Sequence, residues 1–396
     1  MIGQLRNKPV LSSAEVLNKL KNEASKIKGV KETYSLIRKL ASINGSNVTN
    51  AILDRVMYST EMLPPLGKEY WWFLFFGRNG ERPMQLMLLI FRKYGQNMLF
   101  NDKNIVLKRL TENRFRAVTA GWIYDGKELH DLGDTNAITT VCSKRKMIVS
   151  DISGQEMILT GGFPHYELKV GNVIDLNIRK GDYLEDRDAC GVFIPPFGMG
   201  WVDVFSDVEG TVLGEKFEGT AHLQKVVGIT TFGSFHWGRV FFQDGSSTSF
   251  FCLKTGKESK RYFRRSLTFH DYRRKEIVEF KNPELKITEK EGKTPTWVVE
   301  GQDDDKELRI VLESYATRKF TMKGGGSQVY IAYAVVPKQF SLKTTNQIIT
   351  LSHLGRGVGI FEDAYGSPIP NVRNRNGRSK NDGVYDNPYP DTNENL

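Results

Sequence analysis

The chain has 396 residues, of which 39% are hydrophobic, 11% aromatic and 26% charged, and its formal net charge is +10 at pH 7. This composition is typical of a globular protein and excludes a collagen-like, coiled-coil or wholly disordered chain. The longest apolar runs, 71–76 and 84–91, are far shorter than the ~18 residues that cross a bilayer, so no transmembrane helix is expected. The N-terminus lacks the apolar core and cleavage site of a secretory signal, which predicts a cytoplasmic protein.

The residues that usually form metal or redox sites are scattered. Cys142, Cys190 and Cys252 are isolated, so neither a disulfide framework nor a CxxC motif can be written. The six histidines never lie within four residues of one another, which excludes a compact histidine metal motif. Phosphate loops, GxSxG elbows, HExxH and GxGxxG motifs are missing as well. The sequence therefore predicts no cofactor and no metal.

The N-terminal region, residues 1–60, predicts a basic helical leader. Residues 1–43 carry nine Lys or Arg against three Glu. Ser12 to Glu15 form a capping-box pattern, and apolar residues follow at helical spacing until Gly29. A second helix is expected over 31–42. This hairpin either packs across the open end of the next domain or makes a peripheral contact with a membrane or partner through residues 1–43.

From Trp71 to about Phe361 the chain follows a β pattern. Short runs rich in aromatic and β-branched residues alternate with Gly, Asn and Asp, and about seventeen strands are expected. Since no helix-length stretch separates consecutive strands, a doubly wound parallel sheet is excluded. Asp244-Gly245 is the strongest hairpin signal. We predict a mainly β protein with two antiparallel β-barrels, over 61–205 and 206–366, and with strand pairing broken at the proline- and glycine-rich stretch 195–200.

Two further segments are distinguished by composition. Residues 367–396 are rich in Asn, Asp, Pro and Gly, which predicts a disordered tail. Residues 254–275 carry nine Lys or Arg against Glu258 and Asp271, a pattern that suits either a guarded sheet edge or a phosphate-binding surface. The aromatic residues there alternate poorly with the basic ones, so nucleic-acid binding is disfavoured.

Polar residues interrupt two of the expected strands. The even positions of 217–228 share one face and are Glu218, Thr220, His222 and Gln224. If that face points inward, it supplies a carboxylate and an imidazole to an aromatic pocket; if it points to solvent, it has no such role. On the strand 235–242, His236 lies on the opposite face from Trp237, Arg239 and Phe241, and only one of the two faces is expected to point inward.

Motifs in three parts of the chain together resemble one family. The first is Glu69-Tyr70-Trp71-Trp72-Phe73, followed by Asn79-Gly80, Gln85-Leu86-Met87 and Phe91-Arg92. The second joins Val208-Glu209-Gly210 and 217–222 to 235–240 with Asp244-Gly245, and the third is 357–362. These are similar to motifs of the carotenoid 1,2-hydratases (hydroxyneurosporene synthases) and the related AttH-type lipocalin-like proteins. The resemblance covers about 61–366 and implies two tandem lipocalin-like barrels that bind an apolar or isoprenoid molecule in a barrel.

The sequence suggests a chemistry for such a pocket. Hydration, cyclisation or isomerisation of an isoprenoid needs an acid that protonates an alkene, and a carboxyl buried among aromatic rings keeps its proton at neutral pH. The candidate acids are Glu218, Glu69 and Glu362, and His222 is the candidate base. The candidate ligand-binding residues are Trp72, Trp237, Arg239, Phe241 and His236.

These candidates have structural alternatives. Carboxylates that cap strand ends account for Glu69 and Glu362 equally well, and core packing accounts for the tryptophans. In the sharpest form of the hypothesis, Glu218 and His222 face the interior of the second barrel, beside Trp237 and Arg239. The protein is then a cofactor-independent hydratase (a lyase), a cyclase or an isomerase. The alternative is a non-enzymatic lipid carrier or scaffold whose basic leader docks to a membrane or a protein partner.

Overall fold

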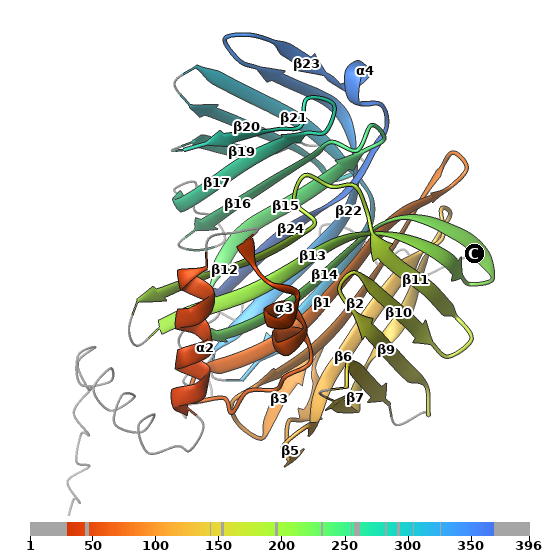
Figure 1. The fold of residues 1–396 in the computed structure, drawn as a ribbon, viewed down its shortest axis with the longest axis vertical. Helices are drawn as coiled ribbons and strands as arrows, with labels where there is room; N and C mark the ends of the chain where they lie inside the picture. The colour runs from red at the N-terminus through yellow and green to blue at the C-terminus, as the bar shows by residue number, and fades with distance from the viewer. Residues whose placement is uncertain are drawn as a thin grey trace, which may run out of the picture.

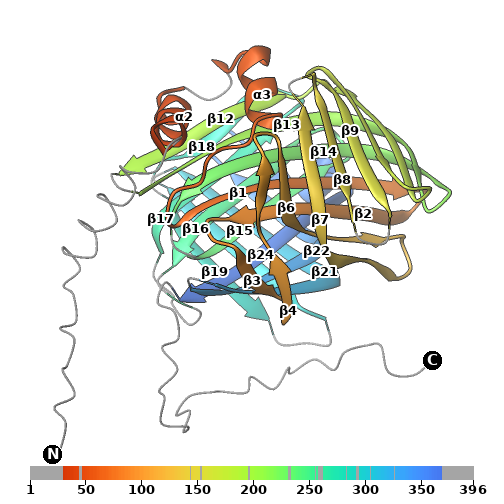
Figure 2. The same cartoon turned by 90° about the horizontal axis from the view of Figure 1, so that it is seen from below.

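The computed structural model describes residues 30–367 apart from residues 44–46, 143, 152–153, 195–196, 231–232, 255, 257–261, 282, 291–293, 304 and 325. The first predicted helix and the predicted disordered tail lie outside these residues. The described part is mainly antiparallel β structure in two sheets, and Figures 1 and 2 show the strands of one sheet crossing those of the other. The predicted fold class is confirmed. None of the helices described is long and apolar enough to span a bilayer.

The first sheet contains most of the strands up to residue 229. Their bounds are β1 Gly67–Asn79, β2 Arg82–Lys93, β5 Arg109–Thr111, β6 Arg114–Tyr124, β7 Leu129–Cys142, β8 Lys146–Ser150, β9 Glu156–Gly162, β10 His165–Val170, β11 Ile174–Lys180, β12 Arg187–Ile194, β13 Phe197–Val212 and β14 Glu215–Ile229. Ten of them close a ring in the order β11-β10-β9-β8-β7-β6-β2-β1-β14-β13, because β13 also pairs with β11. This sheet is therefore a closed barrel.

The second sheet runs in the order β18-β17-β16-β15-β24-β22-β21-β20-β19. Its strands are β15 Ser234–Phe242, β16 Ser247–Lys254, β17 Tyr262–Asp271, β18 Glu276–Phe280, β19 Glu284–Lys290, β20 Thr296–Asp303, β21 Lys306–Lys323, β22 Ser327–Lys343, β23 Ile348–Thr350 and β24 Gly357–Ser367. The hairpin β3 Asn97–Phe100 and β4 Lys103–Val106 joins it from the first half of the chain through β21. In the described part of the chain no pairing joins β18 to β19, so this sheet curls without closing.

In the described residues three helices accompany the sheets: α2 Val30–Ser42, α3 Asn50–Met57 and the short α4 Leu351–Leu354. The predicted second helix is thus present as α2, and its Ile37 and Leu40 are fully buried. Leu53, Val56 and Met57 of α3 belong to the core of the first barrel. Of the two roles expected for the leader, the described helices therefore fulfil the packing role, and membrane contact through residues 1–43 stays a prediction.

The strand β1 shows why its sequence is apolar at almost every position. Its odd residues, including Trp71 and Phe73, pack inside the first barrel. Its even residues, including Trp72 and Phe76, pack against the second sheet. A strand buried on both faces reads as a continuous apolar run rather than an alternating one. The molecule thus has three apolar layers: one in the barrel, one between the sheets and one inside the curl of the second sheet.

The structure places the change of sheet later than predicted. The expected boundary at 205/206 falls inside β13, and β13 and β14 both belong to the first sheet. The chain passes to the second sheet between Ile229 and Ser234. Residues 195 and 196 lie outside the described residues, and residues 197–200 pair with β12, so the predicted break in strand pairing is wrong there. The reason is long-range: β14 pairs with β1 along most of the length of both strands, which no local pattern shows.

Candidate functional site between the sheets

Polar and aromatic side chains from both sheets meet in the layer between them. We call this group the inter-sheet site; it consists of Tyr70, Trp72, Asp203, Phe205, His222, Gln224, Trp237, Arg239, Tyr330 and Glu362. Its members come from six strands: β1, β13 and β14 of the first sheet and β15, β22 and β24 of the second. The sequence hypothesis placed this chemistry inside the second barrel, whereas the structure places it between the sheets.

The first-sheet side of the site centres on a buried histidine. His222 is 2% exposed, and its Nε2 lies 2.7 Å from Oδ1 of Asp203. Gln224 donates to the same oxygen at 2.8 Å. Because a carboxylate only accepts, the histidine Nε2 carries the proton, and Nδ1 is the unprotonated nitrogen. Burial lowers the pKa of His222, although Asp203 opposes the shift, so the ring is neutral and able to accept a proton.

The second-sheet side supplies a carboxylic acid. Glu362 lies on β24 opposite Trp237 of β15 and is 6% exposed. Burial raises the pKa of Glu362 to about 8, and the neighbouring Tyr330 hydroxyl only partly opposes this. The charges of both Glu362 and Asp203 raise the pKa of Tyr70, after the larger effect of burial, so that phenol lies near both carboxyls. At neutral pH this site therefore contains a protonated acid and a separate neutral base.

Aromatic rings and one guanidinium surround these groups. The His222 ring lies 4.6 Å from Phe205 and 5.9 Å from Trp237, measured between centroids. Arg239 lies over Phe205, with 4.2 Å from its guanidinium carbon to the ring centroid. Trp72 meets Tyr330 edge-on at 5.1 Å. Trp237 and Arg239 are half-buried, which leaves this side of the site accessible.

Several buried polar atoms of the site lack a hydrogen-bond partner. They include Nδ1 of His222, Nε of Arg239 and Nε1 of Trp72. A buried donor or acceptor without a partner is costly, and most such groups in folded proteins are satisfied. Three of them in one layer, from both sheets, indicate a surface that a polar ligand group or ordered water completes.

Six of the nine candidate residues belong to this layer: His222, Glu362, Trp72, Trp237, Arg239 and Phe241. Glu218 does not. Its side chain is 70% exposed and pairs with Lys216 at 3.0 Å. The prediction that Glu218 faces an interior was wrong, because its side chain lies in solvent near the beginning of β14.

Glu69 lies inside the first barrel and has a structural environment. It is fully buried, and its Oε1 lies 2.5 Å from Nζ of Lys225, while Nε of Arg92 donates to Oε2 at 2.6 Å. Lys225 also lies 3.1 Å from the Trp71 ring centroid. Burial raises the pKa of Glu69, but the two cations outweigh it and hold the pKa below its usual value. This carboxylate is ionised and bound by two cations, so it has no proton to donate.

His236 lies on the other face of β15, inside the curl of the second sheet. Its Nε2 is 2.8 Å from Nζ of Lys254, and that ammonium lies 2.5 Å from Oδ1 of Asp363. Trp297 and Phe361 pack near the ring. The expectation that only one face of this strand points inward was therefore wrong: both faces are buried, in different layers.

One cluster has the donor types of a metal site. Ligand atoms of Asp125, Glu128 and His130 lie within 4.8 Å of one another in the turn between β6 and β7. However, Asp125 already accepts from the backbone N–H groups of Lys127 and Glu128, at 2.8 and 2.9 Å, and contacts His130 at 2.8 Å. These contacts explain the cluster as a turn.

Sequence reasoning missed Asp203, Tyr70, Tyr330 and Lys225. Asp203 lies in the apolar run 201–205, where its carboxylate is an anomaly that could have been noticed. Lys225 could have been noticed in the same way, because its charge interrupts a largely apolar strand. The tyrosines carry no such signal, since they are common in packed strands.

Comparisons with known proteins find similarity in three-dimensional structure. No protein-family model matches the chain, and no curated protein sequence gives a significant match. Similar solved structures include an AttH-like protein of Nitrosomonas europaea, with 11% identity, a TM-score of 0.40 and coverage of 76% of this chain and 93% of that one. CghA has 11% identity, a TM-score of 0.49 and coverage of 83% and 96%. Kievitone hydratase of Nectria haematococca has 12% identity, a TM-score of 0.42 and coverage of 82% and 96%. An AttH-like protein is therefore among the similar structures, as the sequence resemblance predicts.

Proposed function

We propose that the inter-sheet site binds an apolar, isoprenoid- or lipid-like molecule and catalyses acid/base chemistry on it: hydration, cyclisation or isomerisation. The observation that carries this proposal is the pairing of a carboxyl whose pKa is about 8, on Glu362, with the neutral His222–Asp203 pair in one aromatic layer. Two titratable groups whose surroundings shift their pKa values in opposite directions are the candidates for an acid and a base. The protein is cofactor-independent in this proposal.

The residues divide the reaction between them. Glu362 gives its proton to one carbon of an alkene, and the electron pair of the double bond forms the new C–H bond. The cation at the other carbon then loses a neighbouring proton to Nδ1 of His222, which gives an isomer. In cyclisation, the electron pair of a second double bond first forms a C–C bond to the cation, and the new cation then loses its neighbouring proton to the same nitrogen. In hydration, water adds to the cation and its surplus proton goes to the same nitrogen. Asp203 holds the imidazole in the tautomer that leaves Nδ1 free and stabilises its protonated form.

The aromatic residues would protect and stabilise the intermediate. Trp72, Trp237 and Phe241 present π faces that favour positive charge. They also exclude water that would trap the cation. Arg239 suits a carboxylate or oxygen at one end of the molecule, because its Nε is buried without a partner.

The test combines binding with isotope exchange. Organic extraction and native mass spectrometry of the protein from its source cells should reveal a bound apolar molecule. Farnesol, a simple isoprenoid alcohol, serves as a probe: we expect it to quench tryptophan fluorescence and, in D₂O, to acquire deuterium at its alkene carbons. Glu362→Gln should still bind but should lose the exchange.

A matched control separates chemistry from folding. Glu218→Gln changes an exposed carboxylate on β14, the strand that carries His222, and should leave exchange unchanged. Binding without deuterium uptake in the wild-type protein would favour the carrier function. Absence of both a co-purified molecule and probe binding would refute the proposal altogether.

A further inference from the structure

A basic pocket lies where β2 ends and β6 begins, and it shares no lining residue with the inter-sheet site. Its volume is about 130 Å³, several times the room that one water molecule needs. The lining residues are Met62, Leu63, Arg92, Lys93, Tyr94, Gly95, Leu107, Lys108, Arg109, Phe115 and Arg116. Five of these are cationic and none is acidic, so we call it the basic pocket.

Most of this positive charge is not neutralised by the protein. Arg92 pairs with Glu69. For Lys93, Lys108, Arg109 and Arg116, no carboxylate lies at ion-pair distance in the part of the chain that the structure describes. Exposed lysines and arginines commonly lack partners, but here four of them converge on one concave surface. Like charges held together in this way attract an anion.

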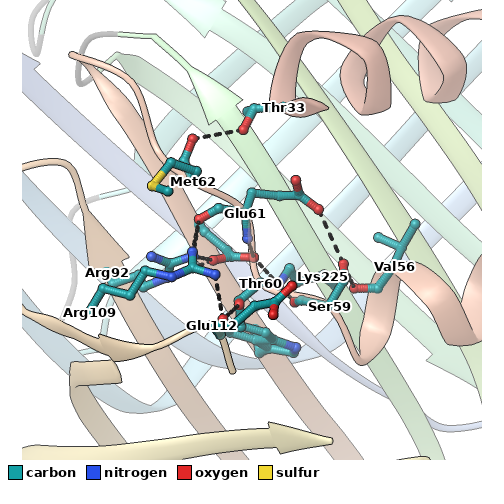
Figure 3. Close-up of polar contacts among 12 residues, drawn as sticks. Thr33, Val56, Ser59, Thr60, Glu61, Met62, Arg92, Arg109, Glu112 and Lys225 are labelled. Carbon is teal, nitrogen blue, oxygen red and sulfur yellow. Dashed lines mark hydrogen bonds and ion pairs between the residues drawn. The ribbon is translucent and has the colours of Figure 1, made fainter. Parts of the chain in front are cut away.

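Two arginines of the pocket lie close together. Nη2 of Arg92 and Nη1 of Arg109 both donate to the carbonyl oxygen of Glu61, at 2.5 and 3.1 Å (Figure 3). Two guanidinium groups therefore meet at one oxygen. Burial lowers the pKa of Arg109, and the charge of Arg92 lowers it further, while the carboxylates of Glu69, Glu112 and Glu61 act in the opposite direction.

The rim of the basic pocket is apolar and exposed. Met62 is 38% and Tyr94 45% exposed, and both line the opening. An anion with an apolar substituent, such as a phosphate ester, could therefore place its charge among the cations and its carbon chain on the rim.

We propose that the basic pocket is an anion-binding site for a phosphoryl group, held by Lys93, Lys108, Arg109 and Arg116. Arginine and lysine are the usual partners of phosphate oxygens, and arginine can bind them in a bidentate manner. The phosphoryl group comes either from a soluble phosphate or from an anionic phospholipid. This site is independent of the proposed function between the sheets.

The experiment uses the full chain and two double variants. Lys108→Gln with Arg116→Gln removes two pocket cations whose side chains make no hydrogen bond to any residue that the structure describes, whereas Arg92 and Arg109 are left in place to hold the backbone. Lys290→Gln with Lys319→Gln removes the same charge from exposed positions of the second sheet and is the control. Thermal melting confirms that both variants fold.

Calorimetric titration with inorganic pyrophosphate, and sedimentation with phosphatidylglycerol or phosphatidylcholine vesicles, distinguish the two sources. We expect the wild-type protein and the control to bind pyrophosphate, phosphatidylglycerol vesicles or both. The pocket variant should bind about tenfold more weakly or worse, because each charge-assisted hydrogen bond contributes roughly one power of ten or more. Binding should also weaken with added salt.

If only pyrophosphate binding depends on the pocket cations, the ligand is a soluble phosphate. If only binding to phosphatidylglycerol vesicles depends on them, the ligand is a lipid headgroup. Either result supports the site. Equal binding by the pocket variant and the control, or no binding of either probe by the wild-type protein, would overturn the proposal. Isotope exchange at the inter-sheet site should be the same in both double variants, so failure of one proposal does not imply failure of the other.

Discussion

Replacing Glu362 with Gln should stabilise the protein at alkaline pH. The buried carboxyl has a pKa of about 8, raised from 4.5. The unfolded chain releases this proton near pH 4.5, whereas the folded protein holds it until about pH 8. Between these values the unfolded state binds fewer protons, so this group lowers the free energy of unfolding as the pH rises, and the loss is complete above pH 8.

The size of the effect follows from the same values. At ~1.36 kcal/mol per pKa unit, a rise from 4.5 to about 8 costs at most ~5 kcal/mol of stability at alkaline pH. Glutamine has nearly the same shape and no charge, so Glu362→Gln removes this cost. At about pH 5 the folded wild-type carboxyl is still protonated, and the variant should differ from it by no more than ~1 kcal/mol.

Urea unfolding followed by circular dichroism measures this difference. Wild type, Glu362→Gln and the exposed control Glu218→Gln would be compared at about pH 5, 7 and 9. The advantage of Glu362→Gln should grow with pH to several kcal/mol, while Glu218→Gln should stay within ~0.5 kcal/mol of wild type throughout. An advantage that is the same at all three pH values would show that Glu362 ionises normally, and the acid role proposed for it would fall.

Two further predictions concern stability. Glu69→Gln leaves two buried cations, Arg92 and Lys225, without their shared carboxylate. It should lower the free energy of unfolding, measured by urea denaturation, by about 3–5 kcal/mol. A loss under ~0.5 kcal/mol would mean that the two cations reach solvent. Gly219→Ala would place a Cβ 2.0 Å from the carbonyl oxygen of Phe76, so it should cost more than ~2 kcal/mol by the same assay. On the same strand, Gly228→Ala meets its neighbours at 3.5 Å or more and should be close to neutral, and similar losses for the two glycines would contradict the argument.

The sequence alone was sufficient for the class of fold and for much of the candidate site. Periodicity and turn residues predicted a mainly antiparallel β protein, the hairpin at Asp244-Gly245 and the helix α2. Alternation along strands correctly grouped Trp237, Arg239 and Phe241 on one face, because side chains of a strand alternate whatever it packs against. These are local properties, and local sequence fixes them.

Only the tertiary structure decided what each face meets. Alternation places Glu218 and His222 on the same side of β14, yet one is 70% exposed and the other 2% exposed. The difference depends on where the second sheet crosses that strand. Likewise, β14 joins the first barrel through its pairing with β1, about 150 residues earlier in the chain. Strand pairing at that separation is set by the packing of whole layers. The same packing places Glu362 and Asp203 near the same tyrosine, Tyr70, and brings Lys225 to Glu69.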